Sequence, residues 1–358
     1  MTFCKKKGTI KLMKQMLKNK NTTIGIITFH SANNYGAVLQ CYALSKVLIS
    51  WGYEVKVVDL PLHNKPKPIR SSIRQWMVSL GFFKFRKHRL PVNIEKSEEC
   101  DLYIFGSDQI WNIDITKENY KLYFGNWIKN YPKIAYAASF GVSKWKHTTY
   151  DKEIKKLLLE FSSIGVRENS GAKICKEIFG INSYQVVDPT ILLTNYKNIF
   201  KQIKQSKSLI CYIFEKENKI NAIKSIGNKI GFKTVILNDF RKRKGIKSVP
   251  FPSVSKWLSY INSGGLILTD SFHCMVFAIL FNKNFIAIPA KLDRIDRMLS
   301  LLKELGLESR FFYNTDEIVN SKVLDENIDY EKVNDRLDSL REDSLNFLKV
   351  SLNEVVND

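Results

Sequence analysis

The sequence is poor in the features that mark disulfide-rich, metal-binding and membrane-spanning proteins. Its six cysteines are scattered and form no CxxC pair, which argues against a disulfide framework or a structural zinc site. No uninterrupted apolar run reaches about 18 residues, so we expect no transmembrane helix. The basic N-terminus lacks the apolar segment and cleavage site of a signal peptide. We therefore expect a cytoplasmic protein with a basic N-terminal extension over residues 1–22.

Acidic residues are scarce relative to basic ones. The chain has 56 lysines and arginines against 35 aspartates and glutamates, a formal net charge of +21. Such a surplus indicates polyanionic partners, namely nucleic acid, an anionic membrane surface or phosphorylated substrates, although a lysine-rich background gives the same number. Charge alone does not choose among them.

One stretch, residues 65–91, lacks acidic residues altogether. It interleaves lysines and arginines with Trp76, Phe82, Phe83 and Phe85. Basic residues alternating with bulky apolar ones can dock at an anionic membrane interface. A nucleic-acid surface has no recognition motif behind it, so we expect no nucleic-acid partner. Residues 63–92 are therefore a basic aromatic insertion, for which peripheral membrane association at the inner face of the cell membrane and a plain solvated segment are the two interpretations.

The rest of the sequence has the alternating pattern of a parallel α/β protein. With 358 residues, 44% of them hydrophobic, the chain is long enough for two domains. Short β-branched runs alternate with longer helical stretches. The clearest unit, residues 24–60, reads strand, helix, strand, so its two strands should be parallel. We predict an α/β fold of two Rossmann-like domains whose mainly parallel sheets face a central cleft.

A polar stretch over residues 195–208 divides the predicted strands into two series. We assign residues 23–200 to the N-terminal domain, 201–325 to the C-terminal domain and 326–358 to a C-terminal helix packed on the body. That helix is predicted because apolar residues beyond Tyr330 recur close to a 3.6-residue period. The predicted strands cover residues 24–29, 54–60, 101–106, 134–141, 162–166, 184–189, 209–215, 233–239, 266–270 and 285–289.

Polar residues follow several of these strands, where open parallel sheets bind their ligands. Helix caps and turns explain any one of them equally well, but several polar loops on one predicted rim favour a binding site. No carboxylate and histidine spacing resembles a catalytic metal site, so we predict no metal and no cofactor. The candidate substrate-binding residues on this rim are Asn34, Tyr35, Gly36, Ser107, Asp108, Gln109, Asn112, Ser139 and Ser271.

His273 is the sharpest candidate for a catalytic residue. It follows the strand over residues 266–270 and precedes a strongly apolar helix, whose N-terminus should point into the cleft. Free backbone N–H groups and the helix dipole would make that point an anion site. A structural histidine in a packed core is the alternative. A dyad with Cys274 is disfavoured, because adjacent helical residues point in different directions.

Arginines supply the positive charge that a small dianionic substrate requires. Arg167 follows the strand over residues 162–166, where its guanidinium could fork a carboxylate or a phosphate. Arg294 and Arg297 follow the strand over residues 285–289. For the last two, surface pairing with Asp293 or Asp296 is the alternative.

With these residues in view, the chain resembles the polysaccharide pyruvyl transferase family. The resemblance extends over residues 24–310, with motifs in consistent order: TFHSANNYGAVLQCYAL, FGSDQIWN, KIAYAASFG, GVRENSG, VVDPTILL, TDSFHCMVFAIL and LDRIDRMLSLLKELGL. It implies two Rossmann-like domains of the GT-B kind. It also implies transfer of a pyruvate ketal from phosphoenolpyruvate (PEP) to two hydroxyls of one sugar.

The resemblance assigns catalytic roles to His273, Arg167, Glu168 and Arg294, with Ser170 in the same motif as Arg167. Glu168 would assist as a second acid or base, or would anchor Arg167. The chain departs from the family pattern at Ser271, where many members have arginine, and at Cys274, where others have glycine. Arg294, Arg297 or a lysine would then have to supply the charge that holds PEP.

The sequence therefore predicts a pyruvyl transferase that acts on a surface-polysaccharide precursor, with PEP as donor substrate. A glycan acceptor on a polyprenyl-pyrophosphate lipid would account for the basic aromatic insertion. One rival hypothesis is a GT-B glycosyltransferase that uses a nucleotide sugar, and another is a non-catalytic carbohydrate- or lipid-binding protein.

Overall fold

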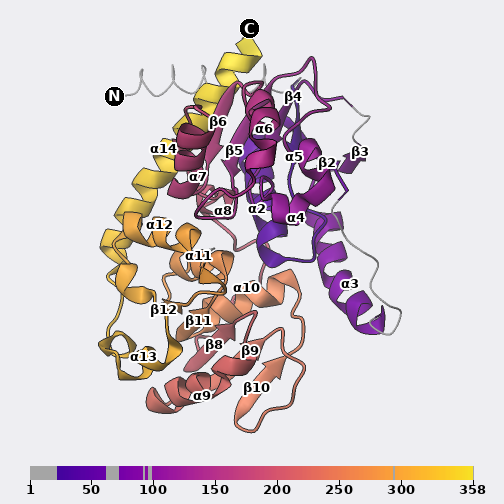
Figure 1. The fold of residues 1–358 in the computed structure, drawn as a ribbon. Coiled ribbons are helices and arrows are strands. Elements are labelled where there is room, and N and C mark those ends of the chain that lie inside the picture. Colours follow the sequence, from indigo (N-terminus) through magenta and orange to yellow (C-terminus); the bar gives the residue numbers. More distant parts are fainter. Residues whose placement is uncertain (1–21, 62–71, 92, 96–98, 293–294, 358) are drawn as a thin grey trace, which may run out of the picture.

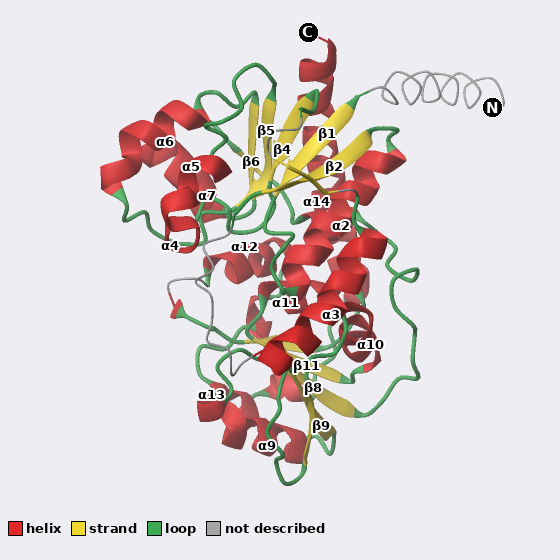
Figure 2. Cartoon of the chain, turned by 90° about the vertical axis from the view of Figure 1, so that its right-hand side faces the viewer, coloured by secondary structure: helices red, strands yellow, loops and turns green. Residues whose placement is uncertain are grey.

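A seven-stranded parallel sheet forms the centre of the N-terminal part of the chain (Figures 1 and 2). The computed structural model describes residues 22–61, 72–91, 93–95, 99–292 and 295–357. The strand order is β3-β2-β1-β4-β5-β6-β7, and every pairing is parallel. The strands are β1 Thr23–Ile27, β2 Glu54–Asp59, β3 Asn93–Glu95, β4 Leu102–Phe105, β5 Lys133–Ala138, β6 Ser163–Val166 and β7 Tyr184–Gln185.

A five-stranded parallel sheet forms the centre of the second part, in the order β10-β9-β8-β11-β12. Its strands are β8 Ser208–Tyr212, β9 Lys233–Leu237, β10 Ile246–Val249, β11 Leu266–Thr269 and β12 Phe285–Ala287. We call the parts around the two sheets the N-lobe (β1 to α8) and the C-lobe (β8 to α13). The predicted fold of two parallel α/β domains is confirmed.

The central strands are mostly apolar because helices cover both faces of each sheet. All residues of β4, β5, β8 and β11 are buried. The helices are α2 Tyr35–Ser50, α3 Ser72–Arg89, α4 Ile113–Thr116, α5 Tyr120–Tyr123, α6 Asp151–Leu158, α7 Asn169–Lys173, α8 Pro189–Leu192, α9 Ile220–Lys229, α10 Val254–Ser263, α11 Phe272–Leu280, α12 Asp296–Leu305, α13 Thr315–Asn320 and α14 Tyr330–Asn357.

Four elements differ from the sequence prediction for local reasons. The strand predicted over 184–189 ends at Gln185, because Asp188 caps α8 by accepting a hydrogen bond from the Thr190 N–H, with Pro189 at the first helical position. The short edge strands β3 and β10 carry too few residues for a clear pattern. Residues 72–89 of the predicted insertion form the helix α3, while its residues 63–71 and residues 1–21 of the predicted extension lie outside the described ranges.

The two lobes share one hydrophobic core. Helices α2 and α8 of the N-lobe contact α11 of the C-lobe. The ring of Tyr35 on α2 stacks on Trp257 of α10, with ring centroids 4.8 Å apart and planes 6° from parallel. The Tyr35 hydroxyl donates to the Pro252 carbonyl oxygen at 2.6 Å, also in the C-lobe. This packing fixes how the two sheets face each other.

Helix α14 returns from the C-lobe to the N-lobe along one side of the molecule (Figure 1). Near its start, the Tyr330 hydroxyl donates to the Lys283 carbonyl oxygen of the C-lobe. Further along, the Ser344 hydroxyl accepts from the Val187 N–H of the N-lobe at 3.0 Å. The predicted C-terminal helix therefore ties the lobes together. None of the helices in the described ranges is long and apolar enough to cross a bilayer.

Candidate active site

A cavity of about 260 Å³ lies between the two lobes. Three N-lobe residues form one wall, and the C-lobe forms the rest from the ends of β8, β11 and β12 and the start of α12. The lining residues are Asn34, Asp108, Gln109, Phe214, Glu215, Asp270, Ser271, Phe272, His273, Pro289, Ala290, Lys291, Ile295, Arg297 and Met298. Of the predicted site residues, the structure brings together Asn34, Asp108, Gln109, Ser271, His273 and Arg297 here.

The turn between β11 and α11 positions His273. Ser271 caps α11, and its hydroxyl accepts a hydrogen bond from the Cys274 N–H at 3.4 Å. Asp270 holds the turn against β8, because its carboxylate accepts from the Phe214 N–H at 3.0 Å. Burial raises the pKa of the Asp270 carboxyl. The N-terminus of α11 and its second residue, His273, therefore border the cavity.

Gly36 of the N-lobe lies directly against the imidazole of His273. A Cβ atom added at Gly36 would fall within the ring's van der Waals surface, 2.6 Å from Cε1 and closer still to Nδ1 and Cγ. Only glycine lets α2 approach the ring this closely. The predicted substrate-binding residue Gly36 is thus a contact of the histidine.

Asp188 joins His273 to the buried residues beneath the cavity. Its Oδ2 lies 3.3 Å from His273 Nε2, and accepts from Ser107 Oγ at 3.0 Å and from Arg167 Nη1 at 2.9 Å. Burial opposes ionisation of the carboxyl, but the neighbouring His273 and Arg167 outweigh burial and lower the pKa of Asp188. Asp188 is therefore an ionised carboxylate in contact with two basic side chains.

Sequence analysis did not single out Asp188, although the signal was present. The residue follows a buried apolar pair, Val186 and Val187, as the other candidates follow their strands. Lys291 was missed in the same way: it comes four residues after β12 and lines the cavity.

Arg167 lies outside the cavity lining, against buried carboxylates of the protein itself. Its side chain is 1% exposed and pairs with the protein's own carboxylates, Asp188 and Glu168, instead of facing the cavity. Burial opposes its charge, but Asp188, Glu168 and Asp108 outweigh burial and raise the pKa of Arg167. The guanidinium also lies 4.8 Å from the Phe272 ring centroid. Arg167 therefore holds Asp188 in place and does not line the cavity, and its predicted contact with a ligand stays a prediction.

Glu168 and its neighbours also lie below the cavity. The Glu168 carboxylate is buried and accepts from Ser139 Oγ at 2.6 Å, and the Ser139 hydroxyl accepts from the Gly141 N–H. The Ser170 N–H donates to Asp296 Oδ2 at 3.0 Å, which links α7 to the start of α12. Of the two roles predicted for Glu168, this geometry matches the anchoring of Arg167 and not direct contact with a substrate.

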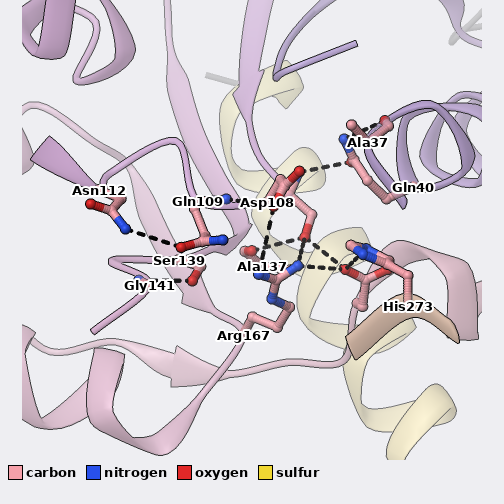
Figure 3. A network of polar contacts seen from close by, with 12 residues as sticks. Ala37, Gln40, Asp108, Gln109, Asn112, Ala137, Ser139, Gly141, Arg167 and His273 are labelled. Atoms are coloured by element: carbon pink, nitrogen blue, oxygen red, sulfur yellow. Dashed lines mark hydrogen bonds and ion pairs between the residues drawn. The ribbon is translucent and has the colours of Figure 1, made fainter. Parts of the chain in front are cut away.

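The N-lobe wall of the cavity carries amide and carboxylate groups. Asn34 caps α2 by accepting from the Ala37 N–H. Asp108 has a φ of 75°, a left-handed conformation that aspartate tolerates, and its Oδ1 accepts from the Gln109 N–H. Asn112 does not line the cavity but donates to Gln109 Oε1 at 3.0 Å (Figure 3). Within the described ranges, this wall has no cationic side chain.

The C-lobe wall carries the basic groups. Lys291 and Arg297 line the cavity on the same side as His273 and the α11 N-terminus. Arg294 lies outside the described residues. Within the described ranges, no group of three or more histidine, cysteine, aspartate or glutamate side chains could hold a metal ion.

Two further candidates lie away from the cavity. Tyr35 points into the packing between the lobes, where its ring and hydroxyl are both engaged, and it does not line the cavity. Its predicted contact with substrate stays a prediction. Cys274 is fully buried, and burial raises the pKa of its thiol to about 12. This agrees with the prediction that Cys274 does not pair with His273 as a nucleophile.

Similarity to solved structures shows the fold class of the chain. The chain is similar to the spinosyn forosaminyltransferase SpnP, with 10% identity, a TM-score of 0.51, and 94% of this chain and 100% of that one covered. It is similar to MnaA of S. aureus, solved with UDP, with 13% identity, a TM-score of 0.52 and coverages of 93% and 97%. It is also similar to a Listeria monocytogenes protein described as a UDP-N-acetylglucosamine 2-epimerase, with 10% identity, a TM-score of 0.53 and coverages of 87% and 90%. These neighbours share the GT-B fold.

The family follows from the sequence. The family model "Polysaccharide pyruvyl transferase" matches residues 34–291, well over half of the chain. A search of curated proteins finds no match. The chain belongs to the polysaccharide pyruvyl transferase family, and this membership implies a pyruvyl transferase enzyme.

Proposed function

We propose that the protein transfers the three-carbon unit of PEP to two hydroxyls of a sugar in a surface-polysaccharide precursor, forming a pyruvate ketal in the cavity between the lobes. The observation that carries this proposal is the position of His273. It borders the cavity at a helix N-terminus, with Lys291 and Arg297 on the same wall.

The C-lobe wall suits the donor. PEP carries a carboxylate and a phosphate on one small enol, so it needs at least two positively polarised contacts. The backbone N–H groups of the first turn of α11 and the helix dipole supply one. Lys291 and Arg297 would supply others, in place of the arginine that many family members have at the position of Ser271.

The N-lobe wall suits the acceptor. Asn34, Asp108 and Gln109 offer amide and carboxylate groups, which hydrogen-bond sugar hydroxyls in both directions. Because this wall lacks a described cation, a second anion would gain little by binding there. The two substrates would therefore approach His273 from opposite lobes.

The ketal reaction balances with proton transfer alone. A proton adds to C3 of PEP, one sugar hydroxyl attacks C2, and the second hydroxyl displaces phosphate as the ring closes. The two hydroxyl protons end on the new methyl group and on the released phosphate. His273 could take a proton from the attacking hydroxyl or deliver one to C3, and both steps place it next to C2. The α11 N-terminus would stabilise the departing phosphate.

Phosphate release from PEP with a panel of acceptor glycans tests the proposal. Wild-type protein should release phosphate only with a suitable acceptor, and His273→Gln should lose about 10²–10⁴-fold in kcat. His147→Gln is the matched control, because His147 lies outside the cavity lining. Full activity of His273→Gln would refute the role assigned to the histidine.

A nucleotide-sugar glycosyltransferase is the second candidate function, because a structural neighbour was solved with UDP. Thermal-shift measurements separate the two. PEP should raise the melting temperature of this protein, and Lys291→Met should abolish the shift. Stabilisation by UDP- or GDP-sugars and none by PEP would favour the glycosyltransferase. A shift with PEP but no turnover on any glycan would favour the non-catalytic binding protein.

A further inference from the structure

Helix α3 has an inner face that packs on the body. Phe82 contacts the Tyr35 ring, with centroids 5.0 Å apart, and Phe85 contacts the Tyr42 ring at 5.8 Å. Val78 is partly buried against the same core. These contacts fix the orientation of the helix, so the side chains on its opposite face must point away from the protein.

That opposite face is aromatic and exposed. Trp76 is 62% exposed and Phe83 is 55% exposed. Together with the partly exposed Leu80, they are spaced by four and then three residues, which places them on one stripe of the helix. A solvated helix face normally carries charged residues. An exposed Trp and Phe on one stripe therefore indicate a surface that binds a partner.

The charge around this stripe is positive. Lys87 continues the stripe and Lys84 flanks it, and both are exposed. Residues 65–91 contain no aspartate or glutamate. An aromatic stripe with flanking lysines and no acidic residue matches the interface of a bilayer that contains anionic lipids, where Trp sits at headgroup level and lysines meet lipid phosphates.

We propose that the outer face of α3, formed by Trp76, Leu80, Phe83, Lys84 and Lys87, binds the surface of an anionic bilayer. Figure 1 shows α3 at the edge of the molecule, and Figure 2 views the molecule from that side, with α3 facing the viewer. The helix is also connected to the site, because Arg86 donates to the Ala32 carbonyl oxygen and to Asn33 Oδ1, next to the cavity residue Asn34. Membrane binding itself does not depend on the proposed function, but it would bring the N-lobe wall close to a lipid-linked acceptor.

Flotation of the full chain with vesicles tests the proposal. The protein should float with vesicles of phosphatidylcholine and phosphatidylglycerol, not with phosphatidylcholine alone, and added salt should release it. Lys84→Gln/Lys87→Gln should lower the partition coefficient about thirtyfold. Trp76→Ser/Phe83→Ser should lower it about tenfold or more, with the melting temperature unchanged.

Two matched controls sit elsewhere on the surface. Leu159→Ser/Ile203→Ser removes apolar side chains that are 65% and 43% exposed. Lys152→Gln/Lys155→Gln removes two exposed lysines of α6 at the same spacing as Lys84 and Lys87. Both controls should bind as wild type does.

Three results would overturn the proposal. The first is wild-type binding that does not depend on phosphatidylglycerol. The second is a control pair that loses as much binding as an α3 pair. The third is an oligonucleotide that displaces the protein from vesicles and binds Trp76→Ser/Phe83→Ser more weakly, which would make α3 a nucleic-acid surface.

Discussion

The buried side of the candidate site depends on a single carboxylate. Asp188 contacts His273, Arg167 and Ser107 at once, and its side chain is fully buried. A buried charge with an opposite partner is tolerated, whereas the same charge without its partner is strongly destabilising. Replacing Asp188 should therefore lower the stability of the fold and also change the position of His273, and the two effects can be measured separately.

Asp188→Asn should lower the free energy of unfolding by about 3–5 kcal/mol, because it leaves the guanidinium of Arg167 buried without its nearest carboxylate. The triple variant Asp188→Asn/Arg167→Met/Glu168→Gln should regain part of that stability, since the guanidinium and both buried carboxylates paired with it are replaced by neutral groups. Its kcat should stay low, with the KM for PEP near the wild-type value, because His273 still lacks its carboxylate partner. Denaturant unfolding measures the loss of stability, and steady-state kinetics measures the loss of activity. If the combined variant loses as much stability as the sum of its single variants, these charged side chains do not stabilise one another.

Gly36 offers a test of the histidine's position that leaves every charge in place. Gly36→Ala should lower kcat about a hundredfold, because the new methyl group displaces the imidazole. Gly81→Ala is the control, since its Cβ would lie 3.6 Å from the nearest atom. Alanine in a helix is favoured over glycine by about 0.5–1 kcal/mol, so the control should be active and slightly more stable. Equal activity of both variants would show that His273 has room to move.

At the scale of elements, α14 is the second connection between the lobes. Its Ser344 accepts a hydrogen bond from the N–H of Val187, the residue before Asp188. The helix thus supports the segment that carries the buried carboxylate. This support comes from a part of the chain more than 150 residues away in sequence.

Ser344→Ala should lower the free energy of unfolding by about 1–3 kcal/mol, because the buried Val187 N–H loses its acceptor. Ser339→Ala, at an exposed position of the same helix, controls for the gain in helix propensity that both changes share. Thermal unfolding of the two variants measures the difference. If they melt together, the contact between α14 and Val187 contributes no stability.

The sequence predicted the central elements well because their patterns are local. The strands that became β1, β4, β5, β8 and β11 are short apolar runs followed by polar turns, and parallel strands place those turns on one rim. Helix α3 was missed because basic and aromatic residues mask its helical period. The partners of Arg167 and Tyr35 could not be predicted, because one guanidinium after a strand fits a ligand as well as a neighbouring carboxylate. The pairing of β6 with β7 brings Arg167 to Asp188, and the contact of α2 with α10 brings Tyr35 to Trp257. Neither contact can be read from the local sequence.

At the scale of the whole molecule, acidity should act through the buried carboxylates. The pKa of Asp188 is lowered in the folded protein from its ordinary value of 3.8. Its contribution to stability is therefore complete above that value and is lost as the pH falls through the folded-state pKa. Asp270 affects stability in the opposite direction. Burial raises the pKa of its carboxyl, so its ionisation at higher pH lowers the stability of the folded protein.

The difference in melting temperature between wild type and Asp188→Asn should accordingly be constant near neutral pH and should shrink below about pH 4. In strong acid both proteins carry a neutral side chain at position 188 and should melt closer together. Calorimetry across an acidic pH series measures this convergence. A gap of constant size down to the lowest pH would mean that the charge on Asp188 does not stabilise the fold.

The contact between Gly36 and the imidazole of His273 has a consequence for the state of the site before substrates bind. The glycine and the imidazole belong to opposite lobes, so moving the lobes apart would remove the surface against which the ring packs and would change the orientation of the ring. The shared core and α14 hold the lobes together, so the ring is oriented toward the cavity before either substrate binds. On the proposed function, the enzyme would not spend substrate-binding energy on orienting this histidine.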